Sequence, residues 1–97
     1  IVSEPWAEVS EKFILQQNYP NPFNPTTVIS WQLAVGSEVT LEVFDIQGQK
    51  IVTLLSASLP SGFHSVTWDA SDVASGVYIC RLQAGPYVET KKMILMR

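Results

Sequence analysis

Few side chains in this sequence could act as a nucleophile, a general base or a metal ligand. His64 is the only histidine, so a serine triad would depend wholly on it, and its place beside a Pro-Ser-Gly turn favours a turn or core-edge residue. Asp69 and Asp72 could form an acid–base pair or bind a metal, but no further ligand lies near them in sequence. Cys80 alternates with large apolar residues, which predicts a buried, unreactive thiol. We therefore expect no catalytic site, no cofactor and no metal centre, and we expect the aspartates to cap their own loop.

An unusual segment combines asparagines, prolines and aromatic residues: Asn18, Tyr19, Pro20, Asn21, Pro22, Phe23, Asn24 and Pro25. Each proline fixes its own φ angle and drives the preceding residue into extended geometry. The asparagines can bond to nearby backbone amides, and Tyr19 and Phe23 can pin the segment onto the rest of the fold. The segment has none of the carboxylates that a calcium site requires. We interpret it as a stiff brace at one end of the sheets; the alternatives are a surface for a proline-recognising partner and a cation site on asparagine oxygens.

The composition of the chain is that of one folded domain. Of its 97 residues, 46% are hydrophobic and 15% are charged, so the chain can bury one core but has too little material for two. A net charge of -3 provides no basic field for nucleic acid, a single cysteine excludes an internal disulfide, and no apolar run approaches the ~20 residues that cross a bilayer. The first residues show no sustained period and lack the features of a signal peptide. We predict a linker from an upstream domain at residues 1–12 and one domain at residues 13–97.

Apolar residues recur in that domain with a period of two, which is the pattern of half-buried strands. Ile29, Trp31 and Leu33 share one face, and Trp68 falls on another such face. The pattern predicts strands at residues 13–16, 27–33, 38–44, 51–55, 64–69, 77–82 and 87–96, separated by glycine and proline turns. We predict an all-β fold, an immunoglobulin-like antiparallel β-sandwich of about seven strands.

The segment at residues 44–50 has the composition of a hairpin turn. Asp45 can accept hydrogen bonds from the amides of the turn, and Gly48 can adopt the left-handed conformation that such turns need. Gly76 follows a serine at another expected turn. We expect these residues to have structural roles.

The end of the chain is basic and apolar: it consists of Lys91, Lys92, Met93, Ile94, Leu95, Met96 and Arg97. Charge at the end of a strand protects a sheet edge against mispairing. Alternatively, the segment is a linear recognition signal, an edge strand that a receptor extends by β-augmentation. Composition alone leaves both interpretations open.

These segments together resemble the C-terminal sorting domain of the type IX secretion system. The resemblance covers about residue 14 to residue 97 and rests on five blocks, LQQNYPNPFNPTTVISWQL, VTLEVFDIQGQKIVTL, SGFHSVTWDA, SGVYICRLQAG and KKMILMR. It matches residues 18–25 to the opening motif of the family, Asp45 and Gly48 to an internal motif, and residues 91–97 to the terminal signal. Gly76 lies in the fourth block, and Cys80 departs from the aromatic or aliphatic residue common there. The middle of the chain is also similar to the immunoglobulin-like domain of the flagellar hook-capping protein.

The resemblance implies a non-catalytic module that directs a secreted cargo protein across the outer membrane. Its implied partners are the outer-membrane translocon, a sortase-like cysteine protease that removes the domain, and an upstream cargo domain in the same polypeptide. The implied route runs through the periplasm to the cell surface or the extracellular space. Two alternatives remain: a structural or carbohydrate-binding accessory module of a secreted hydrolase, suggested by Trp6, Trp31 and Trp68, and a hook-cap-like assembly domain.

Overall fold

The computed structural model describes residues 12–97, so the prediction of a linker at residues 1–12 lies, apart from Lys12, outside the described residues. The described chain forms seven strands and no helix, which confirms the predicted all-β class. The strands are β1 (Ile14–Leu15), β2 (Thr26–Leu33), β3 (Ser37–Asp45), β4 (Lys50–Leu59), β5 (Gly62–Asp69), β6 (Gly76–Ala84) and β7 (Tyr87–Leu95). Within residues 12–97 there is accordingly no helix of a length and hydropathy that could span a membrane.

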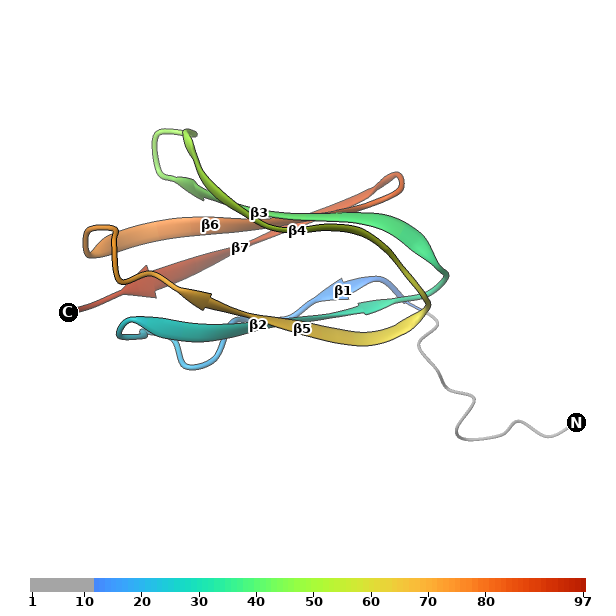
Figure 1. The fold of residues 1–97 in the computed structure, drawn as a ribbon, viewed down its shortest axis with the longest axis horizontal. Coiled ribbons are helices and arrows are strands. Elements are labelled where there is room, and N and C mark those ends of the chain that lie inside the picture. Colours follow the sequence, from blue (N-terminus) through green and yellow to red (C-terminus); the bar gives the residue numbers. More distant parts are fainter. Residues whose placement is uncertain (1–11) are drawn as a thin grey trace, which may run out of the picture.

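The strands form two antiparallel sheets packed face to face, as predicted for an immunoglobulin-like sandwich. One sheet has the order β1-β2-β5 and the other the order β4-β3-β6-β7. Figure 1 shows the two layers, joined at one end by the turns after β2 and after β4. Tight hairpins connect β3 to β4 and β6 to β7, so those strands are neighbours in one sheet. The sandwich thus has β4 and β5 along one side and β7 and β1 along the other.

Strand β4 extends four residues beyond the predicted end at Leu55, to Leu59. The alternation continues there, because Ala57 and Leu59 are half-buried while Ser56 and Ser58 are exposed. Two register shifts against β3 mark bulges in β4. The bulges lie within the predicted part of the strand, and the small side chains of Ser56, Ala57 and Ser58 beyond it give a weak apolar signal, which explains why the sequence underestimates this strand.

The core lies between the sheets and consists of the alternate residues that the pattern places inward. Trp31 and Trp68 are both buried in it, as predicted. Phe23 packs against Trp68 at 5.6 Å between ring centroids, and Trp68 packs edge-on against Tyr78 at 5.6 Å. Burial of each such large side chain contributes about 1.5–3 kcal/mol to folding. The aromatic cluster therefore fastens the segment before β2 to both sheets.

Candidate functional site

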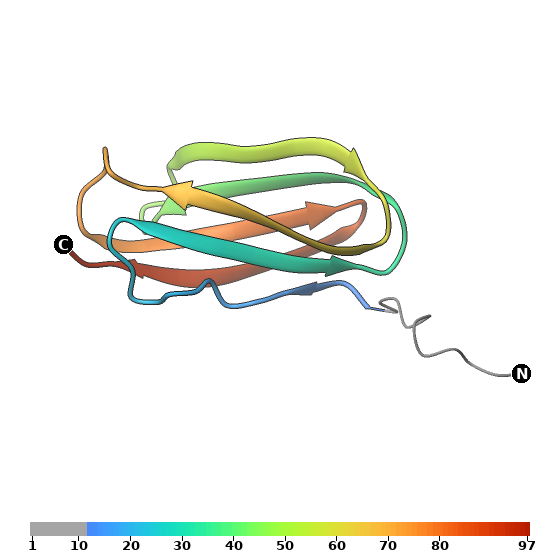
Figure 2. The same ribbon diagram turned by 60° about the horizontal axis from the view of Figure 1, so that its bottom comes forward.

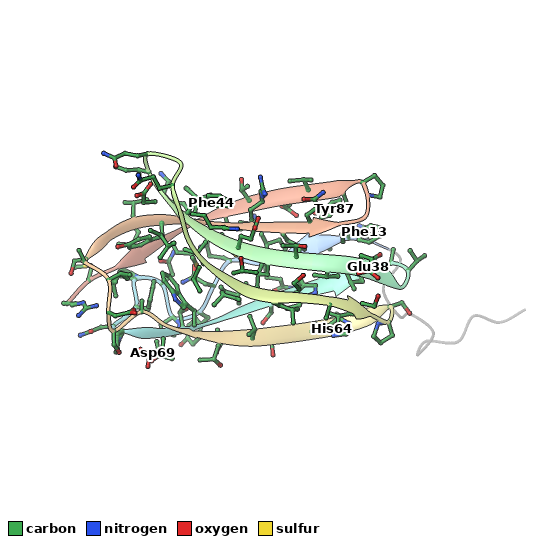
Figure 3. All side chains as sticks on the ribbon, turned by 45° about the horizontal axis from the view of Figure 1, so that its top comes forward. Phe13, Glu38, Phe44, His64, Asp69 and Tyr87 are labelled. Carbon is green, nitrogen blue, oxygen red and sulfur yellow. The ribbon has the colours of Figure 1, made fainter. Side chains whose placement is uncertain are left out.

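The motif segments come together at one end of the sandwich, the end at which the chain terminates. The β3–β4 hairpin, the loop before β6 and the C-terminus all lie there, whereas Phe13 lies at the opposite end (Figures 1 and 3). Phe23 joins this group through a parallel bridge to Leu95. The end of the sandwich that holds these segments is therefore the candidate functional site.

The segment at residues 16–25, called here the opening segment, pairs with the free edge of β7. Phe23 N donates to Ile94 O at 2.9 Å, and Met96 N donates to Phe23 O at 3.0 Å. Ile94 N donates to Asn21 Oδ1 at 2.9 Å, and Gln17 Nε2 donates to Lys92 O at 2.7 Å. Figure 2 shows the opening segment running alongside β7. Residues 92–96 of this edge are therefore already covered in this conformation, and a strand added by a receptor would have to displace the opening segment.

The last residue ties the end of the chain to the loop between β5 and β6. Arg97 Nη2 donates to Ala70 O at 2.5 Å and also to Val73 O. The backbone N of Arg97 donates to Ser75 Oγ at 3.2 Å. Guanidinium groups have several donors in a planar fork, which suits them to bridging two carbonyl oxygens. The terminus is thus held on both sides, by Phe23 and by residues 70–75.

The seven residues predicted as a terminal signal have different surroundings. Met93 and Leu95 are completely buried in the core. Lys92 and Ile94 point to the outer face of the four-stranded sheet, while Met96 is 56% exposed at the end of the sandwich. Only part of the predicted signal can therefore meet a partner without unfolding of β7.

Two details of the opening segment differ from the prediction. Phe23 is buried as expected, but Tyr19 is 79% exposed and pins nothing. Tyr19 exchanges two backbone hydrogen bonds with Val28, so its side chain faces outward with that of Val28. The asparagines do not cap backbone amides of their own segment: Asn21 Oδ1 accepts from the distant Ile94 N, and prolines supply no N–H. Asn18 Nδ2 instead donates to Thr27 Oγ1 at 2.9 Å and to Pro20 O at 3.1 Å.

The turn after β3 has the predicted chemistry. Asp45 Oδ1 accepts hydrogen bonds from Gln47 N and Gln49 N, both at 2.9 Å. Gly48 has a φ of 88°, in the left-handed region that glycine adopts without strain. This turn presents Ile46, which is 73% exposed, at its tip.

His64 and Cys80 have the structural environments that their positions predict. His64 Nε2 lies 2.8 Å from Pro60 O, and its ring stacks on Trp31 at 5.9 Å. Cys80 is buried, and burial raises the pKa of its thiol to about 12. At neutral pH the sulfur is therefore protonated and a poor nucleophile.

Asp69 caps the loop that follows β5, again as predicted. Its Oδ1 accepts a hydrogen bond from Ser71 N at 3.0 Å and another from the Ser71 hydroxyl. These bonds hold the pKa of the Asp69 carboxyl below its usual value. Asp72 is exposed. Within residues 12–97, His, Cys, Asp and Glu side chains form no cluster of three that could hold a metal ion.

Glu89, which no motif in the sequence singles out, joins the two sheets at the β7 edge. Its carboxylate accepts hydrogen bonds from the Tyr87 hydroxyl and from Leu15 N at 3.0 Å, and Lys91 Nζ lies 3.8 Å away. The bond from Tyr87 is the main cause of the lowered pKa of Glu89. Burial, followed by that same bond, raises the pKa of Tyr87 to about 12. The sequence does contain an indication of this role, because Glu89 occupies one of the alternate positions of an apolar strand that face inward.

A second overlooked group lies on the outer face of the four-stranded sheet. Arg81 Nη2 binds Glu42 Oε1 at 2.8 Å, and Lys50 Nζ lies 3.4 Å from Glu42 Oε2. The bond from Arg81 is the main cause of the lowered pKa of Glu42. The Arg81 guanidinium also lies over the Phe44 ring, 4.9 Å from its centroid. The group depends on strands that are distant in sequence, so no local pattern indicates it.

Two comparisons with known proteins agree with this geometry. A family model described as "Secretion system C-terminal sorting domain" matches residues 17–96. Among solved structures, dimeric latent PorU from Porphyromonas gingivalis is similar at a TM-score of 0.59 and 19% identity, over 87% of this chain and 9% of that chain. The Ig1 domain of mouse SynCAM 2 is similar at a TM-score of 0.48 and 18% identity, over 90% of this chain and 95% of that chain. The PorU likeness supports the sandwich fold alone. No curated protein matches the chain.

Proposed function

Because this chain belongs to the family of secretion system C-terminal sorting domains, the sorting signals of type IX secretion, we propose that the end of the sandwich around Met96 and Arg97 is the surface that the secretion machinery recognises. Membership of the family implies export to the cell surface or the extracellular space, and a role in sorting rather than in catalysis. The resemblance stated from the sequence is confirmed by this match.

The observation that carries the proposal is the convergence of the motif segments around the C-terminus. Phe23 exchanges backbone hydrogen bonds with Ile94 and Met96, and Arg97 bonds to the loop that precedes Gly76. Residues that are far apart in sequence thus lie together at this end, and Met96 is exposed there. A receptor that binds there reads the folded end of the domain and not a free tail.

The finer steps of the sorting role are part of the same proposal. The cargo passes through the periplasm, an outer-membrane translocon accepts the folded domain, and a sortase-like cysteine protease removes it as the cargo is attached at the surface. The domain supplies no catalytic group to these steps. The accessory role in binding carbohydrate is less well supported, because Trp31 and Trp68 are buried and cannot form a platform for sugars.

The test uses residues 1–97 fused behind a signal peptide and a reporter, in a host that carries the secretion system. Met96→Ser and Arg97→Ala change the proposed surface and leave the core intact. We expect both variants to leave the reporter in the periplasm while their melting temperatures stay near that of the unchanged domain. Val88→Ser is the matched control, since it removes an apolar side chain from an exposed position on the same strand. Normal surface display of both variants, with display lost when the whole domain is removed, would contradict the proposed location of the signal.

A further inference from the structure

The outer face of the four-stranded sheet is divided into a polar half and an apolar half. An antiparallel sheet with one face in water normally alternates apolar-in and polar-out. Toward the Phe13 end, most outward positions follow that rule, with Glu38 and Thr40 on β3 and Gln83 on β6, although Val88 on β7 is apolar and exposed. Toward the C-terminal end, the half-buried side chains of Phe44, Val77, Ile79 and Ile94 form an apolar patch with the exposed Ile46, and Lys50 and Lys92 border it. Figure 3 shows Phe44 and Glu38 at opposite ends of the same strand.

The register of the strands makes this apolar patch continuous. Phe44 lies directly opposite Ile79, and Val77 lies directly opposite Ile94. Side chains on one face of paired strands lie about 5 Å apart, so they touch across the strands. Ile46, at the tip of the β3–β4 hairpin, completes the patch and lines a shallow depression of about 380 Å³ together with Phe44 and Ile79. None of this apolar surface is required by the core, which lies on the other side of the sheet.

The rim of the patch is cationic and partly preorganised. The Arg81 guanidinium is held between the Phe44 ring and the Glu42 carboxylate, and Lys50 shares that carboxylate. Glu42 has only 13% of its side chain exposed, so little of its charge reaches a partner. Lys92, next to Ile79 in register, is exposed and has no side-chain partner among residues 12–97. The patch therefore has an apolar centre whose border holds Arg81, Lys50 and Lys92 together with the Glu42 and Asp45 carboxylates, and Lys92 is the cation among them that no carboxylate of the described residues pairs.

We propose that this patch is a docking surface for a protein of the secretion machinery whose own surface is apolar at the centre and carries carboxylates at the border. The proposal rests on the sorting function and adds a second contact area to the terminal surface around Met96. An exposed apolar area with a polar rim is the usual form of a protein-binding site. Carboxylates opposite Lys92 and Arg81 would provide charge complementarity and fix the orientation of the partner.

A second copy of this chain fits less well as the occupant. A symmetric contact between two copies would bring the Lys92 and Arg81 charges of both copies together, which opposes association.

The experiment compares export of the reporter fusion after single substitutions in the patch. Ile46→Ser lies at an exposed hairpin tip, and Ile79→Thr keeps a β-branched side chain in its strand, so both should fold. We expect about tenfold less surface reporter for each, as for loss of a central contact residue, with unchanged melting temperatures. Lys92→Glu should reduce export to a similar extent. Lys92→Arg, which keeps the positive charge, should leave export unchanged. Val88→Ser and Phe63→Ser, at other exposed apolar positions, are the matched controls.

The outcomes separate this proposal from the sorting function itself. If the patch variants export normally while Met96→Ser and Arg97→Ala do not, the docking surface is wrong and the sorting function stands. If removal of the whole domain leaves export unchanged, the sorting function fails. Equal losses in the control variants would overturn the docking surface. So would an Ile46-dependent dimer in sedimentation, or Ile46-dependent binding to vesicles containing phosphatidylglycerol, since each identifies a different occupant.

Discussion

The carboxylate of Glu89 bonds one sheet to the other at the β7 edge. It accepts a hydrogen bond from the backbone of β1 while its own strand belongs to the four-stranded sheet. An inward charge on an edge strand also discourages the addition of a further strand. Glu89 therefore protects a part of the β7 edge that the opening segment does not cover. Its ionised form is the better hydrogen-bond acceptor.

The protonation of Glu89 should make the stability of the domain depend on pH. Its pKa is lowered in the folded state, chiefly by the bond from Tyr87 and then by the bond from Leu15 N, so it contributes stability above its unfolded value of 4.5. That contribution is lost as the pH falls from about 4.5 through the lower folded value. We expect Glu89→Gln to reduce the loss of melting temperature between pH 7 and pH 3. Asp72→Asn, at an exposed position, is the control; an equal effect of both substitutions would contradict the role of Glu89.

Among the structural elements, the opening segment contributes most to the edge of the sandwich. It has no regular secondary structure over most of its length, yet it covers the free edge of β7 with backbone and side-chain bonds from Gln17, Asn21 and Phe23. Asn18, which is only 3% exposed, stabilises the start of the opening segment from its buried side. The predicted brace is therefore found along an edge, where it takes the place of an added strand.

The two asparagines at the ends of this segment should differ sharply in their contribution to stability. Asn18→Ala removes the bonds to Thr27 Oγ1 and Pro20 O from a buried site, and we expect a loss of about 1–3 kcal/mol in the free energy of unfolding. Asn24→Ala, at an exposed position, should cost less than about 0.5 kcal/mol. Unfolding in guanidinium, followed by tryptophan fluorescence, measures both values. Equal losses would show that the Asn18 hydrogen bonds contribute no more to the free energy of unfolding than the exposed Asn24 side chain does.

At the scale of the whole molecule, the terminal segment belongs to the core and to the candidate surface at once. Met93 and Leu95 fill the interior, while Met96 is exposed beside them. The proposed recognition surface and the core are therefore coupled in this part of the chain. A change that removes the predicted signal, residues 91–97, also removes half of β7.

Truncation at Lys91 should accordingly abolish the fold and not only the signal. Loss of two buried side chains at about 1.5–3 kcal/mol each, together with the bonds of β7, approaches the whole stability of a domain, about 5–15 kcal/mol. We expect the chain lacking residues 91–97 to show no cooperative thermal transition in circular dichroism. The chain lacking only residues 96 and 97 should still melt cooperatively. A cooperative transition of the shorter chain near that of the full domain would contradict this coupling.

The sequence alone determined the strands, their inward faces and the turn at Asp45 and Gly48. These features depend on neighbours along the chain, through the period of two and through the backbone preferences of glycine and aspartate. The burial of Trp31, Trp68 and Cys80 followed from the same period. The sequence underestimated β4, because the small residues after Leu55 give a weak apolar signal.

The tertiary structure decided what lies against each edge and each outer face. Asn21 and Ile94 are 73 residues apart in sequence, and their bond exists because the opening segment lies beside β7. The same holds for Arg97 with the loop at residues 70–75 and for Phe44 with Ile79. Local pattern carries no information on such pairs, since they depend on which strands become neighbours. The side chains that the sequence offered for chemistry, His64, Asp69 and Cys80, proved to serve the fold, and the surfaces proposed for recognition exist only once the sandwich has formed.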